Sequence, residues 1–105
     1  MSDISSTAES LIGKETGRFD CSGFVAHVYS LHNKSVPHSS AQIWAQGQAG
    51  NGSAGDIVCW DGHVGICDGS GNVIHSYNQN HNIRKDSIDN VSKWDKRTVK
   101  GYRRF

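Results

Sequence analysis

The stretch that decides the fold is GRFDCSGFVAHVYS, residues 17–30, in which a cysteine opens a run of apolar residues. The apolar side chains recur at helical spacing: Phe24, Val25, Val28, Tyr29 and Leu31. This spacing predicts a helix from Cys21 to about His32. Asp20 is a good N-cap, so Cys21 should lie in the first turn, where unpaired backbone N–H groups favour an anion. We therefore expect a lowered thiol pKa and, with a base close by, a nucleophile; without a base, Cys21 is a small structural residue.

Elements on either side of this helix indicate the fold class. Residues 5–14 offer a serine cap and apolar spacing for a first helix, and Ser39 or Ser40 can cap a third that ends at Gly47. Residues 47–55 are predicted as a loop. Four segments then favour strands: DIVCW (56–60), HVGIC (63–67), NVIHS (72–76) and TVKGYRRF (98–105), whereas HNIRKDSIDN (81–90) is ambiguous. Helices followed by a meander predict an α+β domain, with the N-terminal helices packed on one face of a short antiparallel sheet.

Two histidines are predicted to lie on one face of that sheet. A two-residue turn at Asp61-Gly62 pairs Trp60 with His63 and starts the next strand there. A following loop centred on Gly69 would place His75 directly opposite His63. A thiol at a helix start, a strand-borne imidazole and a second imidazole to orient it would supply a nucleophile, a base and an orienting group.

Other readings of these residues remain open. Cys21, His63 and His75 could instead bind zinc, although a fourth ligand is not evident and we expect no metal and no cofactor. Cys59 and Cys67 should point to opposite faces of their hairpin, so we predict no disulfide between them. The remaining histidines are interpreted as solvated or capping residues: His27, His32, His38 and His81.

Length and charge limit the classes of function. The 105 residues suffice for one domain, which we expect to span 1–105. Eleven Lys and Arg against ten Asp and Glu give a net charge of +1, so nothing in the overall field favours nucleic acid or an anionic membrane. The basic segment WDKRTVKGYRRF is interpreted as a solvated strand with flanking charges rather than an anion site. The opening residues lack the basic and apolar regions of a signal peptide, and we expect no membrane span.

Five segments together resemble a known family. FDCSGFVAHVY, SSAQIWAQG, GDIVCW, GHVGICDGSGNVIHS and GYRRF, in this order within residues 9–105, resemble the NlpC-type (NlpC/p-sixty) cell-wall cysteine peptidases, which are papain-like. The resemblance implies that Cys21 is the nucleophile, His63 the general base and His75 the group that orients the base. It places Asp20 and Ser22 along the substrate cleft, where helix capping is an equally good interpretation. The family's tyrosine upstream of the cysteine is missing from AESLIGKETGRF, which leaves the oxyanion donors beyond the Cys21 backbone unassigned.

The same resemblance implies a substrate and a location. The implied substrate is a peptidoglycan stem peptide, cut between D-glutamate and a diamino acid through an acyl-enzyme. We expect a monomer that is secreted or delivered to the bacterial periplasm or cell wall, and hypothesise an antibacterial effector or toxin domain with an immunity or inhibitor protein as partner. The alternatives are a papain-like amidase or acyltransferase, and a non-catalytic binding module of the same fold.

Overall fold

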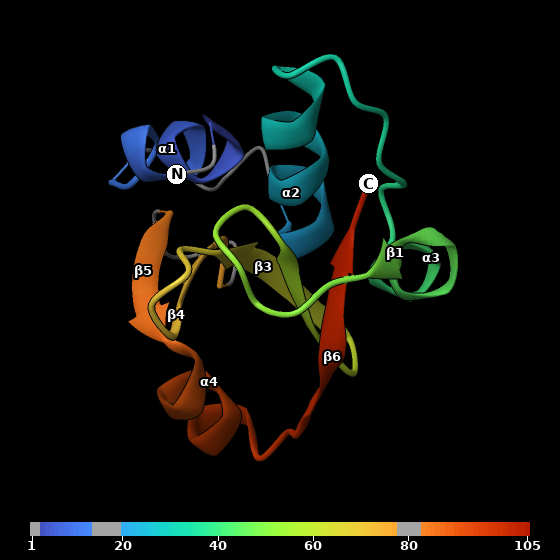
Figure 1. Ribbon diagram of the computed structural model, residues 1–105. Coiled ribbons are helices and arrows are strands. Elements are labelled where there is room, and N and C mark those ends of the chain that lie inside the picture. Colours follow the sequence, from blue (N-terminus) through green and yellow to red (C-terminus); the bar gives the residue numbers. More distant parts are fainter. Residues whose placement is uncertain (1–2, 14–19, 78–82) are drawn as a thin grey trace.

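The computed structural model describes residues 3–13, 20–77 and 83–105 (Figure 1). The helices are α1 (Asp3–Ser10), α2 (Cys21–Ser30), α3 (Ser40–Gln46) and α4 (Ile88–Asp95). The strands are β1 (Gln48–Ala49), β2 (Ile57–Trp60), β3 (His63–Cys67), β4 (Asn72–His75), β5 (Arg84–Ser87) and β6 (Val99–Arg104). They form one antiparallel sheet in the order β1-β6-β2-β3-β4-β5. The predicted α+β class is confirmed.

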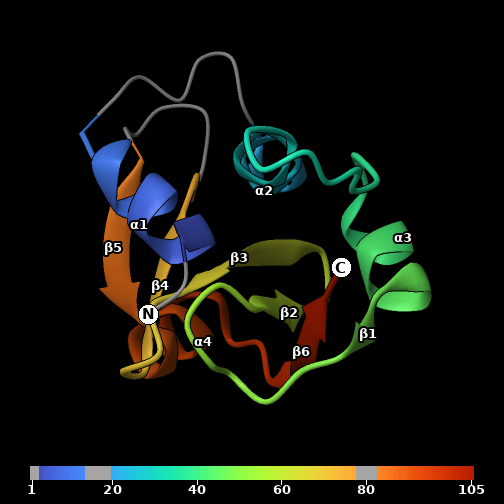
Figure 2. The same cartoon turned by 45° about the horizontal axis from the view of Figure 1, so that its top comes forward.

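Two hydrophobic clusters lie on opposite faces of the sheet. Helices α1, α2 and α3 cover one face, as Figure 2 shows, and bury the larger cluster with Ile57, Val64 and Ile66 of the strands. Val91 of α4 joins the smaller cluster on the other face, which includes Val58 and Cys67. Alternation along β3 therefore places Val64 under the N-terminal helices and His63 on the face of α4. No helix of the described residues is long and apolar enough to cross a membrane.

The predicted helices are found, with one shifted start. α2 begins at Cys21, and Asp20 caps it by accepting a hydrogen bond from the backbone N–H of Gly23 at 2.7 Å. Ser39 caps α3 as expected. α1 begins at Asp3 instead of after a serine cap, because Ile4 and Ala8 both pack on the core and extend the helix backwards; Ser5 is buried within it. The predicted end at Lys14 lies outside the described residues.

The strand register agrees with the first hairpin and differs in the second. Trp60 pairs with His63 as predicted. In the next pair Ile66 lies opposite Ile74, so the loop is centred on Ser70, and the expected direct opposition of the two histidines is wrong. The cause is the Asp68 side chain, which accepts hydrogen bonds from the backbone N–H groups of Ser70 and Asn72 and fixes a longer turn. The register places His75 opposite Gly65, with His63 diagonal to it on the same face.

Two segments contain secondary structure that the sequence did not predict. The ambiguous residues 81–90 contain β5 and the start of α4, whose N-cap Ser87 accepts a hydrogen bond from the Asn90 N–H. The predicted loop 47–55 includes the short strand β1, which pairs with Arg103 and Arg104 of β6. Both additions extend the sheet at its two edges.

Candidate active site

Cys21 lies half-buried at the first position of α2, beside strand β3. Three backbone N–H groups approach its sulfur, those of Val64, Ser22 and Cys21 itself. Burial nevertheless raises the thiol pKa above its ordinary value, and the negative charge of Asp20 adds to the increase. The expected lowering of this pKa is therefore wrong for the resting protein, because loss of solvation outweighs the N–H donors. At neutral pH Cys21 is a protonated thiol.

Asp20 and Ser22 flank the sulfur in different environments. The Asp20 side chain is 53% exposed and lies 2.7 Å from a ring nitrogen of His38. Burial works to raise the pKa of Asp20, but hydrogen bonds with His38 and the Gly23 N–H bring it below its ordinary value. Ser22 is buried and its hydroxyl points back to Asp20 at 3.4 Å. Both residues thus serve the cap of α2, and their contact with substrate stays a prediction.

His63 and His75 are brought together on the α4 face. His63 Nε2 lies 2.8 Å from His75 Nδ1, in a hydrogen bond buried from solvent. Burial, reinforced by the neighbouring imidazole of His75, lowers the pKa of His63 to about 4. Burial also lowers the pKa of His75. Both rings are therefore neutral at pH 7, which is the state a general base requires.

The structure adds an acidic residue that sequence reasoning missed. The second ring nitrogen of His75, Nε2, lies 2.8 Å from Asp86 Oδ2, and the Asp86 side chain is 8% exposed. Arg84 holds the same carboxylate through Nε and Nη2, at 2.7 and 3.0 Å. The spacing of Arg84 and Asp86, two residues apart, would place them on one face of a strand. Their segment, however, lacks the apolar residues by which a strand is recognised in a sequence.

Cys21 and His63 lie near the same peptide of β3, the one that joins His63 to Val64. The sulfur faces the backbone N–H of Val64, the residue after His63, while the His63 side chain leaves on the opposite face of the strand. Among the described residues no hydrogen bond joins Cys21 to His63. Direct proton transfer between them therefore stays a prediction, and it needs the imidazole of this strand-terminal residue to reach the sulfur.

The geometry of the side chains bears on two other interpretations, a zinc site and a disulfide. His63 and His75 direct their nitrogens at each other, so those two atoms cannot also point at a shared ion, and no group of three metal-ligating side chains is found in the described part of the chain. All three cysteines are free, and Cys59 and Cys67 lie in different core clusters, as predicted from the hairpin. His32 contacts Thr7 Oγ1 at 2.7 Å, a contact that the sequence did not indicate.

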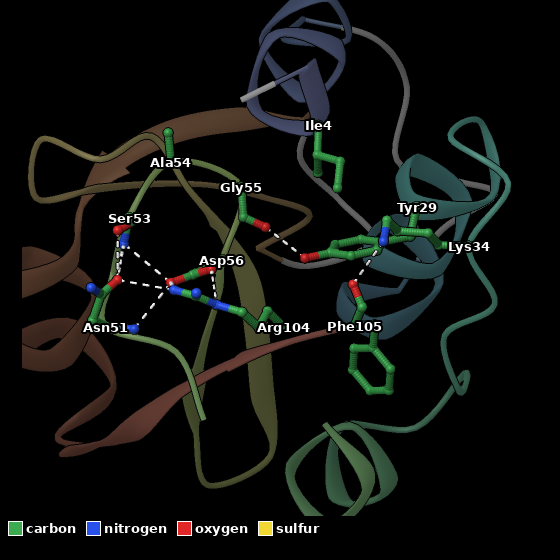
Figure 3. Close-up of a pocket in the computed structure, with 10 residues that line it drawn as sticks. All are labelled: Ile4, Tyr29, Lys34, Asn51, Ser53, Ala54, Gly55, Asp56, Arg104 and Phe105. Atoms are coloured by element: carbon green, nitrogen blue, oxygen red, sulfur yellow. Dashed lines mark hydrogen bonds and ion pairs between the residues drawn. The ribbon is translucent and has the colours of Figure 1, made fainter. Parts of the chain in front are cut away.

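A polar pocket of about 330 Å³ holds none of the predicted site residues (Figure 3). Asp56 lies at its centre and accepts hydrogen bonds from the backbone N–H groups of Asn51, Gly52 and Ser53. Arg104 donates two more, from Nε and Nη2 at 3.0 and 2.8 Å. Asp56 is thus hydrogen-bonded both to its own loop and to Arg104, and these bonds join the 50–56 loop to β6. The basic C-terminal segment is engaged in structure here, in line with its interpretation as a strand.

Fold and candidate site together define a papain-like α+β domain with a helix-borne thiol and two strand-borne imidazoles. The family model of the NlpC/P60 family matches residues 10–103, and the chain belongs to this family. A probable endopeptidase of Corynebacterium glutamicum is 40% identical over 77 residues, which are 68% of this chain and 37% of that protein. The chain thus spans little more than a third of the length of this relative.

Solved structures share the fold. An NlpC/P60 family protein of Bacillus cereus superposes with a TM-score of 0.81 at 23% identity, covering 98% of this chain and 39% of that one. The NlpC/p60 domain of the peptidoglycan hydrolase SagA gives 0.75 at 24% identity, covering 97% and 96%. RipD of Mycobacterium tuberculosis, described as a non-catalytic domain adapted to peptidoglycan binding, gives 0.67 at 18% identity, covering 84% and 90%. The fold therefore occurs with and without catalysis.

Proposed function

We propose that this chain is a cysteine peptidase domain that hydrolyses amide bonds in peptidoglycan stem peptides. Cys21 is the nucleophile, His63 the general base and His75 the group that orients it. The observation that carries the proposal is the buried His63–His75 hydrogen bond next to the peptide that receives the Cys21 sulfur. Membership of the NlpC/P60 family and similarity to a probable endopeptidase support the same activity.

The resting charges fit a mechanism in which the proton moves only with substrate in place. As the Cys21 sulfur attacks the carbonyl carbon, His63 takes the thiol proton, and the backbone N–H of Cys21 helps to hold the oxyanion. The imidazolium then gives this proton to the leaving amine, and the C–N bond breaks to leave a thioester. Water, deprotonated by His63, attacks the thioester, and the released thiolate recovers the proton. Entry of a substrate that completes the site would bring the thiol and the base together.

The proposed bond is the one between D-glutamate and a diamino acid. Purified peptidoglycan is digested with the wild type and with Cys21→Ala, and the new termini are identified by mass spectrometry. We expect free diamino-acid amines from the wild type and none from the variant. Release of whole stem peptides with a free N-terminal amine, cut from the lactyl group of the sugar, would indicate an amidase instead, and transfer of acyl groups without new termini an acyltransferase. No cleavage by the wild type, or equal cleavage by Cys21→Ala, would overturn the proposal.

A non-catalytic binding module is the second candidate. The similarity to RipD and the absence of a direct hydrogen bond between the described Cys21 and His63 side chains favour it. A thiol-directed reagent separates the two candidates, because Cys59 and Cys67 are each only 1% exposed and serve as internal references. Because the resting Cys21 is a protonated thiol, the reagent is carried on a stem-peptide fragment that completes the site. A catalytic Cys21 should react with this fragment faster than with the reagent alone, and its rate should fall in His63→Gln. A binding module sediments with sacculi and shows no such fall.

The delivery and biological role are further proposals. An antibacterial effector or toxin that acts in the periplasm would harm a bacterium when fused to an export signal and spare it when kept in the cytoplasm. A cognate immunity or inhibitor protein would protect the exporting cells. Growth of both strains, each beside its Cys21→Ala counterpart, measures this. Equal growth of all four strains contradicts the effector role.

A further inference from the structure

We propose that Asp86 is a positioning residue that fixes the tautomers of both imidazoles and so leaves Nδ1 of His63 as the basic atom. The inference deepens the proposed function and rests on it for its catalytic consequence. Its structural part concerns only where protons reside on His63 and His75. That part can be measured whether or not the protein cleaves peptidoglycan.

The three side chains form one continuous chain of hydrogen bonds. His63 Nε2 meets His75 Nδ1 at 2.8 Å, and His75 Nε2 meets Asp86 Oδ2 at 2.8 Å. His75 is fully buried, so water does not compete for either of its nitrogens. Both nitrogens of His75 and Nε2 of His63 therefore each have one defined partner within the protein.

The proton positions follow from the acceptor at the end of the chain. An ionised carboxylate only accepts hydrogen bonds, so the hydrogen between His75 and Asp86 belongs to His75 Nε2. A neutral His75 then has no hydrogen on Nδ1, which must accept from His63. His63 Nε2 is therefore the donor, and a neutral His63 keeps a lone pair on Nδ1. Of the four ring nitrogens of His63 and His75, this is the one left to take a proton from a thiol.

Neighbouring charges keep this arrangement in place. Arg84 contacts both oxygens of Asp86 from the same strand, which pairs the two charges and fixes the orientation of the carboxylate. Burial keeps both histidines uncharged, as their lowered pKa values indicate. The other charged groups that act on the pair are Asp95 of α4 and Arg97 beyond it. Asp95 accepts a hydrogen bond from the Tyr77 hydroxyl at 2.7 Å, whereas Asp86 is the carboxylate that contacts a ring nitrogen of the pair.

The chain offers a matched control in Asp68. Its side chain is 7% exposed and pairs with a cation of β5, Lys85, at 3.0 Å, much as Asp86 pairs with Arg84. It contacts the backbone of its own turn and no imidazole. Asp68→Asn removes the charge of a similarly buried, ion-paired carboxylate. Its amide oxygen can still accept both N–H bonds of the turn, which Asp68 accepts at Oδ1, so the β3–β4 register that places His75 should be kept.

The test reads the tautomers directly by ¹⁵N NMR of the histidine side chains at pH 7.5. In the wild type we expect the hydrogen of His63 on Nε2 and a bare Nδ1. In Asp86→Asn, whose amide can also donate, we expect a population with both rings reversed. Asp86→Glu should restore the wild-type pattern, and Asp68→Asn should keep it. On peptidoglycan, kcat should fall about 10- to 100-fold in Asp86→Asn with little change in KM.

Several results would overturn the inference. A hydrogen on Nδ1 of His63 in the wild type does so without any variant, which covers the case that Asp86→Asn does not fold. Unchanged tautomers in a folded Asp86→Asn, or an equal loss of kcat in Asp68→Asn, do so as well. If the wild type shows the expected tautomers and the expected change in Asp86→Asn but does not cleave peptidoglycan, the proposed function fails and the tautomer assignment stands.

Discussion

Asp56 and Asp86 are two carboxylates of similar burial, 7% and 8% exposed, and each is paired with an arginine. Their remaining partners differ. Asp56 accepts hydrogen bonds from the backbone N–H groups of residues 51–53, which cannot lose or gain a proton near neutral pH. Figure 3 shows two of these residues, Asn51 and Ser53. Asp86 forms a hydrogen bond with the imidazole of His75, which in turn forms one with the imidazole of His63. The hydrogen position in the first bond therefore decides that in the second. Burial and ion pairing alone therefore do not distinguish a functional acid from a structural one; the chemistry of its other partners does.

The two regions should therefore fail in different ways. Substitutions around Asp56 should lower the free energy of unfolding and leave the cleavage rate of folded molecules unchanged. Substitutions among the hydrogen-bonded side chains His63, His75 and Asp86 should first change the proton positions and the cleavage rate.

The largest effect is expected from His63→Gln. Loss of the proposed general base should lower kcat on peptidoglycan at least ~10³-fold, while glutamine can still bond to His75 and preserve the fold. Muropeptide release and thermal unfolding of the same preparation measure both quantities. His38→Gln is the matched control, because His38 is 63% exposed and contacts Asp20 instead of the buried pair. Activity retained by His63→Gln would remove His63 from the site.

Asp56→Ala should give the largest loss of stability. The change leaves three backbone N–H groups and the Arg104 guanidinium without their shared acceptor, at a cost of about 3 kcal/mol. Urea unfolding measures it, and the exposed Asp89→Ala should stay within about 0.5 kcal/mol of the wild type. The cleavage rate of folded Asp56→Ala at low temperature should equal that of the wild type. A rate that falls with stability intact would reverse the roles of the two acids.

The sequence indicated the parts of both regions that depend on local chemistry. The Asp20 cap fixes where α2 begins, and the Asp61-Gly62 turn fixes the register from Trp60 to His63, so both were predictable. The common face of the two histidines follows from alternation. Their diagonal offset does not, because it depends on how the Asp68 side chain folds the next loop.

Asp86 escaped prediction for a physical reason. Its strand, RKDS, has no apolar residue and is held by pairing with β4 and by charges from distant segments. Lys85 reaches Glu9 of α1 at 2.6 Å and Asp68 of the β3–β4 turn at 3.0 Å. Such ion pairs appear only once the chain is folded. Helix α4 was missed likewise, since Val91 is its only residue buried in the core.

The pH dependence of stability should report the histidine chain. His63 has a pKa of about 4 when folded and near 6.5 when unfolded, so between these values the unfolded chain binds more protons. Its contribution, about 3 kcal/mol, is complete above pH 6.5 and is lost as the pH falls towards 4. Urea unfolding at pH 7.5, 5.5 and 4.5 should show the loss in the wild type and a shallower slope in His63→Gln. Equal slopes would mean that His63 is not buried as a neutral ring.

The smallest effect concerns the contact that ties α2 to the loop around Asp56. The Tyr29 hydroxyl donates to the carbonyl of Gly55 at 2.6 Å inside the protein (Figure 3). Tyr29→Phe leaves that carbonyl unpaired and should cost about 1–2 kcal/mol, against less than about 0.5 kcal/mol for the exposed Ser30→Ala on the same helix. Because Tyr29 contacts no imidazole of the pair, its variant should keep the wild-type pH slope, tautomers and kcat. A changed tautomer of His63 in Tyr29→Phe would show that the two acid-centred regions are coupled through α2, and their separation into a structural and a chemical region would not hold.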